Sequence, residues 1–322
     1  MPEKLRIIFM GTPEFAVESL RALLKNDQQI VGVITTPDKP AGRGKQMTES
    51  PVKQFARKAG ITPILQPENL KSPEFIENLK ALRADLQLVV AFRMLPEIVW
   101  SMPPKGTVNL HASLLPDYRG AAPINWCIVN GEKESGATTF FIEKDIDTGK
   151  IIFQDKVEIG PRMNAGQLHD ILMIKGSQLL VKTVNAIAEN QYPSVSQSEL
   201  INSTIIKQAP KIYRDDCRIN WNNNAEQIYN LIRGLCPYPA AWTEISDGNS
   251  TLMLKLYESS YEIKKHSYKP GTLFSNGTDF LKVASADGLI SIDNLQAAGK
   301  KRMEITEFLR GFKNISQYTI HP

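Results

Sequence analysis

The sequence predicts an α/β fold in which a doubly wound, mostly parallel sheet precedes a smaller, β-rich domain. Two features of the chain support this prediction. Over the first half, strand-length apolar runs alternate with helix-length amphipathic stretches, an order typical of a parallel sheet covered by helices on both faces. After the polar stretch 190–198, short apolar runs alternate with turn-forming residues, a spacing typical of a small β-barrel.

The elements of the first half follow from hydrophobic periodicity. The expected strands are Leu5–Met10, Ile30–Thr35, Leu86–Ala91, Thr107–His111, Thr138–Ile142 and Ile151–Ile159. The expected helices lie around 15–24, 51–59, 73–83, 122–130 and 164–188. Ser50-Pro51 and Ser72-Pro73 each combine a capping serine with a proline at the first helical position, so the starts of these two helices are well defined.

The pattern changes beyond residue 190, where a polar stretch lacks helical periodicity and resembles a linker. We therefore expect a first domain over 1–189, a linker over 190–207 and a second domain over 208–322. The second domain should contain a helix near 225–235. Its expected strands are Thr251–Tyr257, Thr272–Phe274, Phe280–Ala284 and Leu289–Ile292.

Composition argues against several classes of protein. Of the 322 residues, 42% are hydrophobic and 22% charged, as in an ordinary globular chain with a full core, and the length favours about two domains. The three cysteines are scattered and lack a C-x-x-C spacing, which disfavours a disulfide framework or a metal site and fits a cytoplasmic setting. No stretch approaches the ~20 apolar residues of a membrane span, so we expect no membrane association.

The most informative feature of the chain is an amide and an imidazole two residues apart. Asn109 and His111 end the apolar run that begins at residue 106, and residues i and i+2 of a strand face the same side. A hydrogen-bond donor beside a titratable ring suits a reaction that builds charge on a carbonyl oxygen. Asp147 supplies a carboxylate suited to holding the ring. Taken alone, however, such a motif is more often structural than catalytic.

Several other segments share one resemblance with this motif. The pattern Asn109-x-His111-x-Ser113-Leu114-Leu115-Pro116 continues into Tyr118-Arg119-Gly120, and Asp147-Thr148-Gly149 follows. The segments Ile8–Ala16, Pro37–Lys45, Pro237–Thr243 and Gly299–Met303 extend the pattern over nearly the full chain. In this combination the chain resembles the folate-dependent formyltransferases, and within them the branch whose acceptor is methionyl initiator tRNA.

The resemblance implies a Rossmann-like first domain and an OB-like barrel as the second. It implies transfer of the formyl group of 10-formyltetrahydrofolate, the co-substrate, to the α-amino group of methionyl initiator tRNA, for translation initiation in the cytoplasm. We further expect a monomer without a bound metal.

The same resemblance assigns roles to particular residues. The catalytic residues would be Asn109, His111 and Asp147. Folate would contact Ser113, Leu114, Leu115 and Pro116 together with Arg93, Met94 and Leu95. The tRNA would contact Lys39, Arg43 and Lys45. These lysines and the arginine lie in residues 36–58. That segment contains six basic and two acidic residues, for a net charge of +4. Such a patch can meet phosphates, although most charge runs are solvated loops.

The residue types at the proposed site fit formyl transfer. When an amine attacks a formyl carbon, negative charge develops on the formyl oxygen and the nitrogen must lose a proton. Asn109 can donate an N–H to that oxygen, and protonated His111 can do so more strongly. Asp147 can hold the imidazolium or bind a water that relays the proton. Asp145 is an alternative carboxylate, and the family's Asp-Thr-Gly pattern favours Asp147.

Other functions remain open at the level of sequence. The acceptor could instead be a sugar nucleotide, a glycinamide ribotide or water. A non-catalytic RNA-binding protein on the same scaffold is disfavoured by the intact catalytic trio. A dehydrogenase using the turn at residues 11–13 is disfavoured because G-x-G-x-x-G is absent and Pro13 removes a backbone donor. At Phe92-Arg93 the family usually has a Tyr-Gly pair, so Arg93 could crowd the pterin pocket or reach the acidic tail of the folate.

Overall fold

The computed structural model describes residues 4–41, 46–201, 205–312 and 315–320. The chain forms two compact units, and each draws on separate stretches of sequence. The first unit comprises Met1–Gly120, Ser135–Val157 and His169–Gln208, and the second comprises Ala121–Glu134, Glu158–Leu168 and Ala209–Pro322. Two segments from the middle of the chain thus group with the C-terminal part. The expected domain limits at 189 and 208 stay a prediction.

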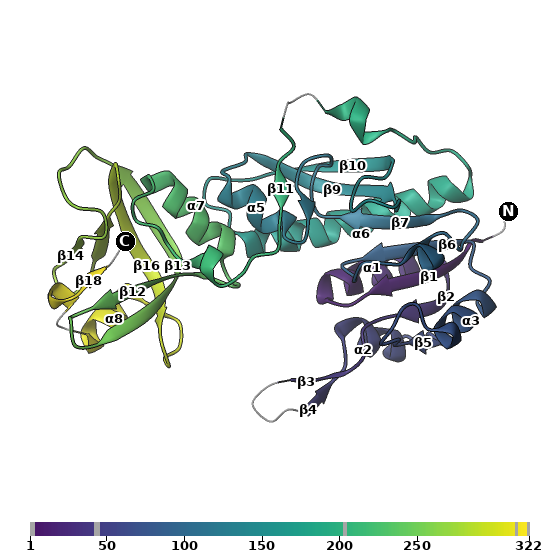
Figure 1. Ribbon diagram of the computed structural model, residues 1–322, viewed down its shortest axis with the longest axis horizontal. Coiled ribbons are helices and arrows are strands. Elements are labelled where there is room, and N and C mark those ends of the chain that lie inside the picture. Colours follow the sequence, from purple (N-terminus) through teal and green to yellow (C-terminus); the bar gives the residue numbers. More distant parts are fainter. Residues whose placement is uncertain (1–3, 42–45, 202–204, 313–314, 321–322) are drawn as a thin grey trace. The chain divides into compact units, whose positions relative to one another are not determined.

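The first unit is built on a seven-stranded sheet with the order β10-β9-β7-β6-β1-β2-β5 (Figure 1). Its strands are β1 (Arg6–Gly11), β2 (Gln29–Ile34), β5 (Ile64–Leu65), β6 (Leu86–Val90), β7 (Thr107–His111), β9 (Glu134–Phe141) and β10 (Ile151–Glu158). The pairs β1/β2, β1/β6, β6/β7 and β2/β5 are parallel, whereas β7 and β9 are antiparallel. Every residue of β6 is buried, as a central parallel strand requires. The predicted mostly parallel sheet is confirmed.

The five helices expected before residue 190 begin and end close to their expected limits. They are α1 (Glu14–Lys25), α2 (Pro51–Lys58), α3 (Pro73–Ala81), α5 (Pro123–Val129) and α6 (Ala165–Ala188). The expected cap of α2 is confirmed, because the Ser50 side chain accepts a hydrogen bond from the Lys53 N–H at 3.1 Å. Ser72 precedes α3 in the same way but makes no side-chain cap. Helix α3 buries Phe75 and Leu79 in one core cluster with residues of β1 and β6.

The second unit contains an antiparallel, barrel-like sheet with the order β14-β15-β16-β13-β12-β18. Its strands are β12 (Ala241–Ser246), β13 (Thr251–Ile263), β14 (Leu273–Ser275), β15 (Leu281–Ala284), β16 (Gly288–Ala297), β17 (Met303–Glu304) and β18 (Thr319–Ile320). Helix α7 (Ala225–Leu235) starts with a capping box between Asn224 and Gln227 and shares one core with this sheet. The prediction that a small β-barrel follows the parallel sheet is confirmed.

Several elements differ from the expected ones. Strands β13 and β16 extend beyond the expected apolar runs, where polar residues such as Glu258 and Asp293 interrupt the hydrophobic pattern, and the last half of β13 is largely exposed. Strand β12 and the hairpin of β3 (Lys39–Ala41) and β4 (Gln46–Thr48) lie outside the expected strands. The short elements are α4 (Glu97–Trp100), β8 (Arg119–Gly120), η1 (Gln197–Leu200), β11 (Gln208–Ala209), η2 (Asp215–Cys217), α8 (Ile305–Gly311) and η3 (Ile315–Gln317).

Helix α6 meets the length and composition of a membrane span, with a mean hydropathy of 1.2 over its 18-residue window. This differs from the expectation that no stretch of the chain comes close. Half of that window is buried, and Leu168, Leu172 and Leu180 are 0% exposed. A core helix has these properties too, so α6 is only weak evidence for a membrane segment.

Candidate active site

His111 lies at the carboxyl end of β7. Open parallel sheets bind their ligands beyond the carboxyl ends of the strands. The residue is buried, with an exposure of 6%. Its backbone pairs in register with Thr138 of β9. The ring packs edge-on against Phe140, with centroids 6.5 Å apart. Nε2 lies 2.8 Å from the carbonyl oxygen of Tyr118. Because a carbonyl can only accept, Nε2 carries a hydrogen, and Nδ1 is the ring atom left for chemistry.

Asp147 is the carboxylate that the fold brings to this ring. Its Oδ2 lies 3.9 Å from Nδ1 of His111 and accepts a hydrogen bond from the Gly120 N–H at 3.0 Å. The backbone of Asp147 has φ = 55°, a left-handed conformation that costs a non-glycine residue energy and is frequent at functional sites. Asp145 is exposed, and its carbonyl oxygen accepts from the Thr148 hydroxyl at 3.0 Å. The geometry therefore favours Asp147 over Asp145.

Asn109 precedes His111 by two residues on β7, so their side chains leave the same face of the sheet. It pairs in register with Val89 of β6 and Phe140 of β9. Its side chain is partly exposed, and the described residues provide no hydrogen-bond partner for its amide. An amide held by two neighbouring strands and open to solvent can donate to an incoming oxygen.

The loop after β7 is fixed by its own hydrogen bonds. The Ser113 hydroxyl is fully buried and donates to the Asp117 carbonyl at 2.8 Å. Thr138 Oγ1 donates to the Ser113 carbonyl at 2.6 Å and accepts from the Leu115 N–H at 3.2 Å. Leu115 is 2% exposed. Of the four residues expected here to touch folate, Leu114 and Pro116 are therefore the accessible ones.

The second expected folate segment, residues 91–96, is less uniform. Met94 is 75% exposed, whereas Leu95 is 8% exposed and belongs to the core of the first unit. The Arg93 guanidinium donates to the carbonyl oxygens of Glu68, at 2.8 Å, and Pro67. Its Nε is buried without a hydrogen-bond partner. Arg93 thus braces the loop at 67–68, and the two roles considered for it from sequence stay predictions.

Of the three residues expected to touch tRNA, Lys39 is exposed on β3, and Arg43 and Lys45 lie outside the described residues. The base of the β3–β4 hairpin is held by Asp38. Its carboxylate accepts from Lys53 Nζ at 2.6 Å and from Gln66 Nε2 at 2.7 Å. The hydrogen bond from Lys53 is the main cause that lowers the pKa of Asp38 below its ordinary value.

Two residues near the site, Gln197 and Arg119, have no role assigned from the sequence. Gln197 lies in the polar stretch expected to be a linker, yet it is 2% exposed. Its amide contacts the backbone of the Asp147 loop and the side chain of Arg119. Arg119 belongs to the quoted motif without an assigned role. A lone glutamine in a run of Asn, Gln and Ser has no periodicity that could distinguish it.

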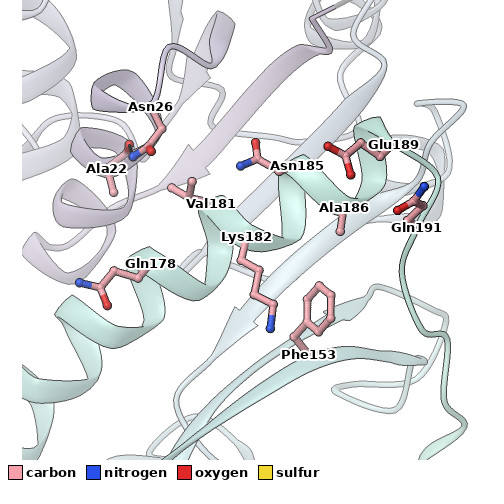
Figure 2. A pocket seen from close by; sticks show the side chains of 10 residues that line it. All are labelled: Ala22, Asn26, Phe153, Gln178, Val181, Lys182, Asn185, Ala186, Glu189 and Gln191. Atoms are coloured by element: carbon pink, nitrogen blue, oxygen red, sulfur yellow. Dashed lines mark hydrogen bonds between the residues drawn. The ribbon is translucent and has the colours of Figure 1, made fainter. Parts of the chain in front are cut away.

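The first unit has a groove of about 600 Å³. Figure 2 shows the side chains that line it, which come from α1, α6, β10 and the segment after α6. Lys182 of α6 lies over the ring of Phe153 in this groove, with Nζ 4.3 Å from the ring centroid. None of the predicted catalytic or folate-binding residues lines the groove. Among the described residues, no group of three or more His, Cys, Asp or Glu side chains is placed to hold a metal ion.

Comparison with known proteins agrees with the fold. The family model described as formyl transferase matches residues 4–184, and the model described as formyl transferase, C-terminal domain matches residues 211–313. The chain belongs to the formyl transferase family. The resemblance inferred from the motifs is thereby confirmed.

Curated relatives specify the branch of the family to which the chain is similar. It is 51% identical to the methionyl-tRNA formyltransferase of Parabacteroides distasonis over 321 residues, 99% of each chain. It is 51% identical to the methionyl-tRNA formyltransferase of Flavobacterium johnsoniae, over 96% of each chain.

Solved structures support the fold at lower identity. The N-formyltransferase from Helicobacter canadensis, solved with folinic acid and dTDP-3-aminofucose, has a TM-score of 0.60 at 22% identity. That match covers 93% of this chain and all of the other. HypX from Aquifex aeolicus in complex with tetrahydrofolic acid has a TM-score of 0.61 at 15% identity. The match spans 96% of this chain but only 48% of HypX.

Proposed function

We propose that this chain transfers the formyl group of 10-formyltetrahydrofolate to the α-amino group of methionyl initiator tRNA, for translation initiation. The observation that carries the proposal is the placement of Asn109, His111 and Asp147 together at the carboxyl end of β7. Relatives about 50% identical over nearly the full chain, all named methionyl-tRNA formyltransferase, support this acceptor.

The three side chains divide the chemistry among them. Asn109 directs an amide N–H to the formyl oxygen, which becomes negative as the amine attacks the formyl carbon. His111, protonated on both nitrogens, donates Nε2–H to the Tyr118 carbonyl. Its Nδ1–H donates to the formyl oxygen. Asp147, 3.9 Å from Nδ1, stabilises this imidazolium and takes the proton that the attacking nitrogen sheds, directly or through a water.

The donor brings an activated formyl group bound to a nitrogen. When the tetrahedral carbon collapses, this nitrogen takes up the proton released by the attacking amine, passed on from Asp147, and leaves as an amine. The accessible side chains of Leu114, Pro116 and Met94 are apolar, as the wall for a flat heterocycle should be. Arg93 lies next to Met94 in the chain and has one buried nitrogen without a hydrogen-bond partner. These residues fit a folate, and their contacts with it are part of the proposal.

Contacts with tRNA are proposed for each unit separately. In the first unit, Lys39 and the basic residues of the β3–β4 segment would meet the phosphates. In the second unit, Tyr268 and Phe280 are 51% and 38% exposed. Tyr268 packs against Phe274 with centroids 4.7 Å apart, and Lys269 lies next to it in sequence. Exposed rings with nearby cations form a surface on which bases can stack.

The proposal extends to the setting of the enzyme. The three cysteines are free and buried, as expected of a chain in the reducing cytoplasm. We propose a cytoplasmic monomer without a bound metal, and sedimentation of the purified chain tests the oligomeric state.

The test of the function is a formylation assay with several acceptors. Purified chain is incubated with 10-formyltetrahydrofolate and methionyl initiator tRNA, methionyl elongator tRNA, a sugar nucleotide or glycinamide ribotide. Formyl-methionyl initiator tRNA, resolved on an acid gel, is the expected product. Tetrahydrofolate release with another acceptor, and none with the initiator tRNA, would keep the site and overturn the acceptor.

A further inference from the structure

Gln197 is a buried amide in a segment whose sequence indicates a polar linker. It begins η1, nine residues after the end of α6, and is 2% exposed. Burying an amide costs free energy unless its hydrogen-bonding groups are satisfied. Its neighbours in sequence are partly or fully exposed, so burial of this one side chain reflects specific partners rather than general packing.

The partners of Gln197 satisfy its amide. Nε2 donates to the carbonyl oxygens of Asp147, at 2.8 Å, and Gly149, at 2.9 Å. Oε1 accepts from Nε of Arg119 at 3.1 Å and from Nη2 at 2.6 Å. Carbonyls only accept and a guanidinium only donates, so these partners fix the orientation of the amide without ambiguity.

The segment that carries Gln197 is itself anchored to the first unit. Val195 and Ile151 exchange two backbone hydrogen bonds, at 2.9 and 3.0 Å, in an antiparallel bridge. Ile151 is the first residue of β10. The glutamine is therefore presented from a strand edge rather than from a free loop, and its position relative to the sheet is defined.

The loop that Gln197 holds is the one that positions the carboxylate. Asp147 has φ = 55°, and a conformation of this kind costs on the order of 1 kcal/mol or more unless its surroundings enforce it. At Gly149 a Cβ would lie 1.7 Å from the Phe141 carbonyl oxygen, so only glycine allows this close approach. The loop is tightly folded, and the two carbonyls that Gln197 binds lie on either side of Thr148.

Gln197 also binds Arg119, the residue before the Gly120 N–H that contacts the Asp147 carboxylate. Arg119 immediately precedes Gly120, whose N–H donates to Asp147 Oδ2. By binding the guanidinium of Arg119 and the carbonyl of Asp147 together, one amide joins the backbone that carries the carboxylate to the side chain of the residue before Gly120. We propose that Gln197 is a positioning residue that keeps the Asp147 carboxylate beside Nδ1 of His111. This inference rests on the catalytic role proposed above for Asp147.

The test is a double-mutant cycle between Gln197 and Asp147, measured as kcat of formyl transfer by the full chain. Gln197→Ala alone should lower kcat roughly 10- to 100-fold with both KM values within about 2-fold, as for a group acting through catalysis. In an Asp147→Ala background, the same change should lower kcat by less than about 2-fold, because residues acting as a unit are not additive. Gln191→Ala, an exposed glutamine of the same segment, is the matched control and should match the wild type.

Gln197→Glu separates the donor role of Nε2 from the acceptor role of Oε1. It also replaces the alanine variant in the test if that variant does not fold. A glutamate still accepts from Arg119 but cannot donate to the two carbonyls, so kcat should fall as in Gln197→Ala. A wild-type kcat in Gln197→Glu, or an equal fold-loss from Gln197→Ala in both backgrounds, would overturn the inference. Wild-type turnover in Asp147→Ala would instead overturn the catalytic role of Asp147, so the two failures are distinguishable.

Discussion

The strand-end site of Asn109, His111 and Asp147 differs from the segment 91–96 in how polar groups are satisfied. At the strand-end site the chain supplies partners for two of the three side chains and their loop, Tyr118 for His111, Gly120 for Asp147 and Thr138 for the loop, while the Asn109 amide stays open within the part of the chain that the structure describes. In the segment 91–96, Met94 is 75% exposed and Arg93 Nε is buried without a partner. The side chains of His111 and Asp147 are therefore pre-organised by the fold, whereas the segment proposed to bind folate offers surface that a ligand would cover.

The largest effect that this comparison predicts is at Asp147. Asp147→Ala should lower kcat by about 100-fold or more, as expected on loss of a group that moves a proton, with no loss of the folded state. Asp145→Ala is the matched control in the same loop and should remain within about 3-fold of wild type. Steady-state formylation by both variants checks this. A large loss in Asp145→Ala with normal turnover in Asp147→Ala would assign the role to the other carboxylate.

The next largest effect is on the free energy of unfolding, through the hydrogen bonds that Thr138 makes with the loop after β7. Thr138→Val removes a buried hydroxyl that donates to the Ser113 carbonyl and accepts from the Leu115 N–H and, at 3.0 Å, from Gln154 Nε2. We expect the free energy of unfolding to fall by about 1–3 kcal/mol, because buried partners are left unsatisfied. Urea denaturation measures it, with the exposed Thr48→Val as control. Equal stability of the two variants would show that this loop is not fixed by Thr138.

A smaller effect is expected at Met94, where the comparison predicts a ligand contact without a structural role. Met94→Ala should raise the KM for 10-formyltetrahydrofolate by roughly 5-fold, corresponding to about 1 kcal/mol of lost apolar contact. The kcat and the midpoint of unfolding should be unchanged, because the side chain is mostly exposed. A destabilised Met94→Ala with an unaltered KM would contradict the assignment.

The smallest effect is the pH dependence of the β3–β4 hairpin base. The hydrogen bond from Lys53 lowers the pKa of Asp38 in the folded state from its ordinary 3.8. A lowered folded pKa gives stability that is present above about 3.8 and is lost as pH falls through the folded pKa. Asp38→Asn should therefore have a lower Tm than wild type near about pH 7, with a difference that shrinks toward about pH 2. A constant difference across this range would rule out the ionic contribution.

Sequence patterns predicted the elements that periodicity and local capping determine. The buried strands β6 and β7, the helix α2 with its Ser50 cap, and the pair Asn109 and His111 are local features of this kind. The β3–β4 hairpin and the exposed half of β13 are polar, so hydrophobic periodicity could not indicate them. Gln197 could not be found because its partners lie about 50 and 80 residues away in sequence. Only the folded chain shows that a polar stretch braces the Asp147 loop.

We propose that His111 and its neighbours transfer a formyl group to methionyl initiator tRNA. The most direct measurement is single-turnover formylation of that tRNA by wild-type chain and by His111→Ala, with and without 10-formyltetrahydrofolate, and with Tm recorded for both. We predict a formylated product that requires the folate and that forms at least about 100-fold more slowly in a folded His111→Ala. Equal rates for the two chains, or a product without the folate, would contradict the account.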